Sequence, residues 1–198
     1  MFASQGVHAI EYILKKGGRI FLDLKFYDIP NTVARVSQAV SHMGVHMLNV
    51  HASGGIKMMQ KVKKVVEETC KQEGMEMPLL LGVTVLTSFD ERTFQSTYQT
   101  KKSVKEMVSY LASYVKKAGF HGVVASSEEI KLIKKKQGSD FIVVTPGIRP
   151  DWGTKGDQVR VMTPKEAFDN GADYIVVGRP ITEAEDPAKA AKQILEEL

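Results

Sequence analysis

The sequence of residues 21–32 is FLDLKFYDIPNT, and it decides how the chain can fold and where a functional site can lie. Side chains alternate between the two faces of a strand, so Asp23 and Lys25 are predicted on one face and Leu22 and Leu24 on the other. A charge inside a protein is costly unless it is paired or used. The stretch, which runs into a helix start, therefore predicts a buried charge pair and a functional site. A structural salt bridge at the strand end is the alternative.

The composition indicates an ordinary globular protein, because 43% of the 198 residues are hydrophobic and 25% are charged. We predict a single domain over residues 1–198. No apolar run approaches the roughly 18 residues of a membrane span, and the N-terminus lacks a basic region followed by an apolar one. We therefore predict a cytoplasmic protein with no membrane partner. The single cysteine, Cys70, excludes an internal disulfide and argues against a thiolate metal cluster.

The net charge of +4 does not predict a nucleic-acid partner. The lysines at 61, 63, 64 and 134–136 alternate with glutamates at helical spacings, which is typical of solvated helix faces. No aromatic residues lie among these lysines, so nucleic-acid binding is not expected. A mild positive excess does suit a small anionic substrate.

Short apolar runs alternate with longer amphipathic segments along the whole chain. The predicted strands are residues 20–24, 47–51, 79–83, 122–125, 141–145 and 174–177. The predicted helices are residues 8–16, 32–42, 56–72, 103–117, 128–136, 164–170 and 187–197. Repeated β-α units favour an α/β fold, either a (β/α)8 barrel or an open doubly wound sheet. No GxGxxG follows a strand, and polar residues gather at many strand ends, so the barrel is preferred.

Two further stretches carry candidate binding residues. Residues 175–180, IVVGRP, end a strand with Gly178, which lets an anion approach the backbone, and Arg179, which can bind phosphate oxygens. A glycine turn with a solvated arginine is the alternative. Residues 145–158 form a long loop after the previous strand, which indicates a lid or, alternatively, a disordered insertion.

The remaining polar residues do not indicate a metal or a nucleophile. His51 lies at a predicted strand end, and a structural role is preferred for a lone histidine. The sequence contains no HExxH and no histidine pair at metal spacing, so we predict no metal. No serine lies in a GxSxG turn, so no Ser/His/Asp triad is proposed.

Several motifs together resemble the orotidine 5′-phosphate decarboxylases of the bacterial type. They are DLKxxDIPNT from residue 23, NVHA from 49, LTS from 86, TPGIR from 145, DQxR from 157 and VVGRPIT from 176. The similarity covers essentially the whole chain in the right order. DxKxxD alone is shared with sugar-phosphate decarboxylases and aldolases, whereas IPNT, PGIR and DQxR make the match specific.

The resemblance implies a (β/α)8 barrel and a homodimer with shared active sites. It also implies conversion of orotidine 5′-phosphate to uridine 5′-phosphate and CO2, in de novo pyrimidine synthesis, without metal or organic cofactor. By position, Lys25 would protonate C6 of the pyrimidine, Asp23 would lie beside the substrate carboxylate, and Asp28 would reach into the neighbouring subunit's site. The residues that would bind the substrate or form the lid over its phosphate are Ile29, Thr32, Thr87, Arg149, Gln158, Gly178 and Arg179.

The chain departs from the family at its N-terminus. Family members begin with two strands that carry an aspartate and a second lysine of the charge network, and residues 1–6 resemble the region after them. We therefore expect an N-terminally truncated barrel without strands 1 and 2, so that the activity of these 198 residues in isolation is a question for experiment. The alternatives are a Mg-dependent relative of sugar-phosphate decarboxylases and hexulose-phosphate synthases, or a non-catalytic remnant that binds nucleotide phosphates.

Overall fold

A computed structural model of the protein describes residues 2–152 and 162–198. The chain divides into two compact units. The first contains residues up to 83 together with 114–122, and the second contains residues 84–113 together with those from 123 onward.

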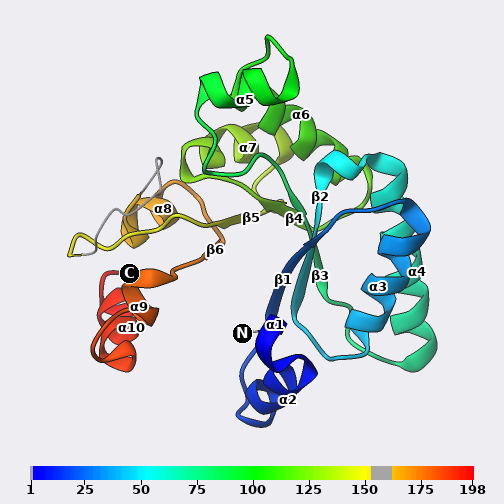
Figure 1. The fold of residues 1–198 in the computed structure, drawn as a ribbon, viewed down its shortest axis with the longest axis horizontal. Coiled ribbons are helices and arrows are strands. Elements are labelled where there is room, and N and C mark those ends of the chain that lie inside the picture. The colour runs from blue at the N-terminus through cyan, green and yellow to red at the C-terminus, as the bar shows by residue number, and fades with distance from the viewer. Residues whose placement is uncertain (1, 153–161) are drawn as a thin grey trace. The chain divides into compact units, whose positions relative to one another are not determined.

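The first unit is built on three parallel strands. These are β1 (Phe21–Phe26), β2 (Met47–His51) and β3 (Leu79–Val83), and β2 pairs with both of the others. The helices of this unit are α1 (Phe2–Gln5), α2 (Val7–Lys15), α3 (Pro30–Ser41) and α4 (Ile56–Glu73), with a short 3-10 turn, η1, at Ala52–Gly54. Helices α3 and α4 pack against each other beside these strands (Figure 1).

The core of the first unit begins with a row of leucines across its strands. Leu22 of β1 is in register with Leu48 of β2, and Leu48 is in register with Leu80 of β3. All three are buried, as are Val33 of α3 and Met58 of α4. Each such side chain contributes on the order of 1.5–3 kcal/mol by leaving water. These buried side chains, which recur at strand and helix spacings, thus stabilise the unit that carries Asp23 and Lys25.

The second unit contains the strands β4 (Gly122–Val124), β5 (Ile142–Thr145) and β6 (Tyr174–Ile175). β5 and β6 are parallel, and the Ala125 N–H, just after β4, donates to the Val144 carbonyl of β5 at 3.1 Å. The helical segments are α5 (Glu91–Tyr98), η2 (Ser127–Glu129), α7 (Ile130–Gln137), α8 (Pro164–Asp169), α9 (Arg179–Thr182) and α10 (Pro187–Glu196). Helix α6 (Val104–Lys117) begins in the second unit, and its residues from Tyr114 onward belong to the first.

The prediction of an α/β fold with parallel strands is confirmed, and a strand lies in each of the six predicted places. β1 ends two residues later than predicted, at Phe26, and α3 begins at Pro30, with proline in its first turn. Helix α5 was not predicted. It starts at an N-cap, where the Asp90 carboxylate accepts from the Thr93 N–H at 2.7 Å, and it buries Phe94.

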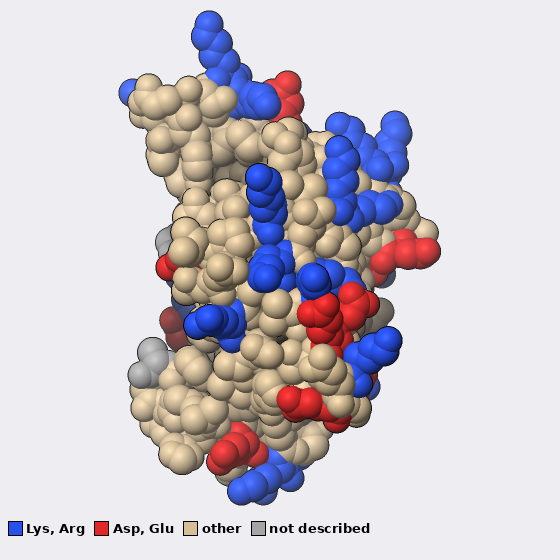
Figure 2. Space-filling model, turned by 90° about the vertical axis from the view of Figure 1, so that its right-hand side faces the viewer, with Lys and Arg blue, Asp and Glu red and all other residues tan. Residues whose placement is uncertain are grey.

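Acidic and basic side chains are interspersed on the face that α3 and α4 cover (Figure 2). On α4, Lys63 pairs with Glu67 at 2.9 Å and Lys64 with Glu68 at 3.8 Å, both one helical turn apart. Lys64 is 67% exposed, as the interpretation of solvated helix faces requires, whereas Lys63 is only 22% exposed and Lys134 16%. Among the described residues, no helix has the length and apolar character that crossing a membrane requires.

Candidate active site

The candidate site is built on an irregularity in β1. Leu22 is in register with Leu48 and Phe26 with Val50, so four steps along β1 correspond to two steps along β2. The extra residues include Asp23 and Lys25. Lys25 has φ 50°, in the left-handed region that an L-residue with a side chain rarely adopts. Local strain of this kind persists where surrounding contacts hold it, and it is concentrated at functional sites.

Three residues of the first unit form a connected polar cluster. The Lys25 ammonium, Nζ, donates to Asp23 Oδ1 at 2.7 Å. The same carboxylate oxygen accepts from Asn49 Nδ2 at 2.5 Å. Asn49 Oδ1 accepts in turn from the backbone N–H of Lys25 at 2.8 Å. The predicted meeting of Asp23 and Lys25 is therefore present, and Asn49 of β2 is a third member to which sequence reasoning assigned no role.

The charge pair is not buried as the sequence predicted. In the single chain the Lys25 and Asp23 side chains are 38% and 43% exposed, and Leu24 is 36% exposed. The physical reason is that β1 pairs only with β2 among the described strands, so one edge of β1 is uncovered. Asn49, on the central strand of the first unit, is fully buried.

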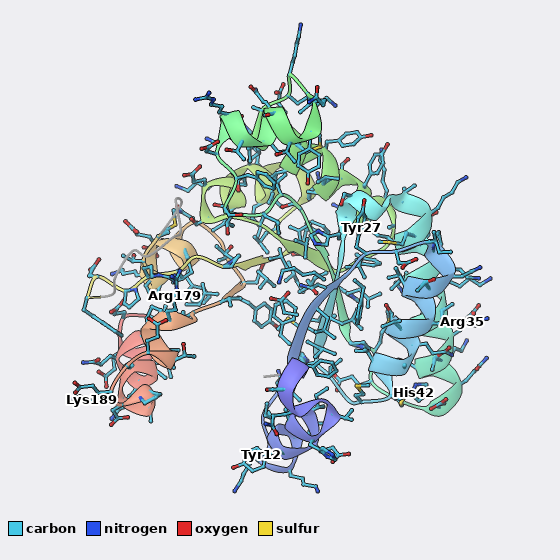
Figure 3. The ribbon with its side chains drawn as sticks, viewed as in Figure 1. Tyr12, Tyr27, Arg35, His42, Arg179 and Lys189 are labelled. Carbon is cyan, nitrogen blue, oxygen red and sulfur yellow. The ribbon has the colours of Figure 1, made fainter. Side chains whose placement is uncertain are left out.

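His51 lies at the end of β2, near the Lys25 and Asp23 charges. Its ring meets that of Tyr27 edge to face, with the centroids 5.7 Å apart. Tyr27 projects beside η1 and the start of α4 (Figure 3). Burial lowers the pKa of His51, the Lys25 charge lowers this pKa further, and the Asp23 charge opposes these effects. The ring contact with Tyr27 is consistent with the structural role that the sequence favoured for His51.

The other site candidates of the first unit lie at the entry to α3. One carboxylate oxygen of Asp28, Oδ1, accepts from the N–H of the next residue, Ile29, at 2.6 Å. Asp28, Ile29 and Thr32 are exposed, with Ile29 at 67%. Exposed positions leave these side chains accessible to a ligand or to another chain. No cluster of three or more potential metal ligands of the His, Cys, Asp or Glu types occurs among the described residues.

In the second unit, Gly178 and Arg179 form the turn into α9. The Gly178 carbonyl accepts from the N–H groups of Ile181 at 2.9 Å and of Thr182 at 3.0 Å. A Cβ added to Gly178 would meet no heavy atom within 4 Å, so the space beside this backbone is open. Arg179 is half-buried at the first position of α9 (Figure 3). The binding of an anion by Gly178 and Arg179 stays a prediction.

The remaining predicted residues belong to the loops of the second unit. Arg149 is buried, and its Nη1 donates to the Ile148 carbonyl at 2.8 Å. Its backbone N–H donates to the Met162 carbonyl at 3.0 Å. Thr87 is half-buried in the segment before α5. Gln158 and residues 153–157 of the predicted lid lie outside the described residues.

Parallel strands with polar residues at their carboxyl ends, here a lysine–carboxylate pair and, elsewhere, a glycine–arginine turn, are typical of α/β enzymes. A profile of the orotidine 5′-phosphate decarboxylase / HUMPS family matches residues 1–194. The chain belongs to this family.

Individual relatives agree with the family assignment. The chain is 48% identical to orotidine 5′-phosphate decarboxylase of Geotalea uraniireducens, across 100% of this chain and 81% of the relative. It is 45% identical to the enzyme of that name from Moorella thermoacetica, across 100% and 78%. The crystal structure of orotidine 5′-phosphate decarboxylase from Lactobacillus acidophilus superposes with a TM-score of 0.83 at 38% identity, over 97% of this chain and 80% of that one. These names do not favour the Mg-dependent alternative.

Proposed function

We propose that this protein decarboxylates orotidine 5′-phosphate to uridine 5′-phosphate in de novo pyrimidine synthesis, in the cytoplasm. The observation that carries the proposal is the contact between the Lys25 ammonium and the Asp23 carboxylate, 2.7 Å apart. It occurs in a chain that is 45% and 48% identical to two enzymes of this name.

In the proposed chemical step, the reacting groups are the Lys25 ammonium and the substrate, with Asp23 beside them. The bond between C6 and the carboxylate breaks, CO2 leaves, and the electron pair stays on C6. The Lys25 ammonium attracts this developing negative charge and then transfers a proton from Nζ to C6. Asp23 holds the ammonium in place and lies beside the substrate carboxylate. No metal or organic cofactor takes part in this scheme.

The lysine alone is too weak to account for catalysis. Two unit charges about 4 Å apart attract by about 4 kcal/mol at an effective dielectric constant of 20, whereas enzymes lower barriers by up to about 23 kcal/mol. Binding energy from the distant phosphate must supply much of the difference. In the proposal, Arg149, Gln158, Gly178 and Arg179 bind the phosphate and close the lid, and Thr87 contacts the pyrimidine.

We further propose a homodimer with shared active sites. Asp28, Ile29 and Thr32 would contribute to the neighbouring subunit's site, which is consistent with their exposure at the start of α3. The finer fold prediction, a (β/α)8 barrel, belongs to the same proposal. In each unit the paired strands are consecutive in the chain, as in a barrel, whereas a doubly wound sheet reverses its order at a switch point.

The test follows the loss of orotidine 5′-phosphate by absorbance with the purified chain and with Lys25→Met. We expect turnover by the wild type and a loss of about 10²–10⁴-fold or more in the variant, the usual effect of removing a proton donor. Lys64→Met, on the exposed face of α4, is the control and should keep full activity. Binding of uridine 5′-phosphate without any turnover by the wild type would contradict the proposal and favour the non-catalytic alternative.

A further inference from the structure

Strand β1 departs from regular pairing with β2 at the point where Asp23 and Lys25 lie. Between the paired positions Leu22–Leu48 and Phe26–Val50, β1 has three intervening residues and β2 has one, Asn49. The β2–β3 ladder is regular through the same position, with Asn49 opposite Leu81. The distortion is therefore confined to β1, and Asn49 is the residue that faces it.

Asn49 uses both ends of its side-chain amide on β1. Its oxygen accepts from the Lys25 backbone N–H at 2.8 Å, and its nitrogen donates to Asp23 Oδ1 at 2.5 Å. An extra residue in a strand is left without its regular ladder partner, so a side-chain acceptor takes the place of a β2 carbonyl. The second bond fixes the carboxylate oxygen that also receives the Lys25 ammonium.

We propose that Asn49 is a positioning residue for the reaction: its amide holds the left-handed backbone of Lys25 and orients Asp23, so that the ammonium and the carboxylate face the substrate together. This inference rests on the proposed function. Asn49 acts through its two neighbours and is not itself a proton donor.

The chemistry of the site restricts which residue can do this. An apolar side chain would leave the Lys25 N–H without its acceptor and the Asp23 carboxylate without one of its donors. An aspartate would keep the acceptor but would place a second negative charge against Asp23. The Lys25 N–H needs an acceptor and the Asp23 carboxylate needs a neutral donor, and the asparagine amide supplies both. Asn49→Ala removes both groups, whereas Asn49→Asp removes only the neutral donor, so the two variants are complementary tests.

The first test measures placement without reference to activity, by amide hydrogen exchange in the full chain. Asn49→Ala should raise the exchange rate of the Lys25 amide by about tenfold or more, because one hydrogen bond is lost. Val50→Ala, which truncates the next buried residue of β2, is the matched control and should leave that amide no faster than its neighbours. An unchanged Lys25 rate in Asn49→Ala would overturn the proposal.

The second test is the pH dependence of turnover. Asn49→Ala should lower kcat by about 100-fold, the usual cost of a misplacement of about 1 Å, while affinity for uridine 5′-phosphate stays close to that of the wild type. In Asn49→Asp, the introduced carboxyl can donate to Asp23 only when protonated. Its activity relative to the wild type should therefore rise as the pH falls, by up to about tenfold per pH unit.

The charged residues bonded to Asn49 are Asp23 and Lys25, and His51 lies two residues further along β2, so the readout is the ratio of the Asn49→Asp profile to the wild-type profile, in which the groups common to both proteins cancel. If Asn49 were merely structural, the variant would contain less folded protein, and the ratio of its activity to that of the wild type would be lower by the same factor at every pH. Parallel profiles for Asn49→Asp and the wild type would refute the positioning role. If the wild type shows no turnover, the proposed function fails, and the exchange experiment alone decides whether Asn49 places Lys25.

Discussion

The strained backbone of Lys25 leads to a prediction in which glycine stabilises a strand. Lys25 has φ 50° within β1, where neighbouring residues are extended. Glycine adopts this region without penalty, whereas alanine does not. We predict that Lys25→Gly gives a more stable protein than Lys25→Ala, which reverses their usual order in a strand. Both variants lack the ammonium and should be inactive.

The magnitude follows from two opposing terms. A left-handed residue with a side chain costs roughly 1–2 kcal/mol, and glycine in a strand costs roughly 0.5–1 kcal/mol in chain entropy. Both variants lose the same ion pair with Asp23, whose side chain is 43% exposed, so that contribution cancels in the comparison. The free energy of unfolding of Lys25→Gly should therefore be higher than that of Lys25→Ala by about 0.5–1 kcal/mol. For a chain of this length the difference corresponds to a Tm higher by about 1–4 °C.

The assay is urea and thermal unfolding of both variants, with the same pair of substitutions at Leu24 as the control. Leu24 does not have a positive φ, so Leu24→Gly should be less stable than Leu24→Ala by roughly 0.5–1 kcal/mol. The reasoning is refuted if Lys25→Ala is as stable as Lys25→Gly, or more stable. That result would mean that Lys25 does not store strain at this site.

Three further predictions concern stability. Gly82→Ala should cost about 1–3 kcal/mol in a urea titration, because its Cβ would overlap the Val115 side chain; a loss below about 0.5 kcal/mol would contradict this packing. Asp173→Ala should cost about 1–2 kcal/mol in the same assay, since its carboxylate accepts from the Val143 N–H at 2.7 Å, and an unchanged midpoint would speak against that bond. Burial, and after it the charge of Lys63 on α4, lower the pKa of His121 below 6.5. As the pH falls, His121 is therefore protonated in the unfolded chain before it is protonated in the folded one. Stability should fall as the pH drops below about 6.5, and His121→Gln should reduce this slope; an equal slope in both proteins would contradict its assignment to His121.

Much of the fold could be predicted because its signals are local. Apolar runs placed each strand to within a few residues, and the spacing of Asp23 and Lys25 predicted their contact. Helix α5 was missed because it is short and depends on one capping contact at Asp90 and on the burial of Phe94. The expected burial of the charge pair was wrong because burial depends on what covers β1, which is not encoded in the strand itself.

The sequence by itself determined the α/β pattern, the family and the identity of the charged pair, because periodicity and motif spacing belong to the chain. Only the tertiary structure decided that Lys25 adopts a left-handed conformation and that Asn49 bonds both members of the pair. The physical reason is register: a side chain from the neighbouring strand meets the distorted part of β1 only after the two strands have paired, at a sequence separation of 24 residues from Lys25.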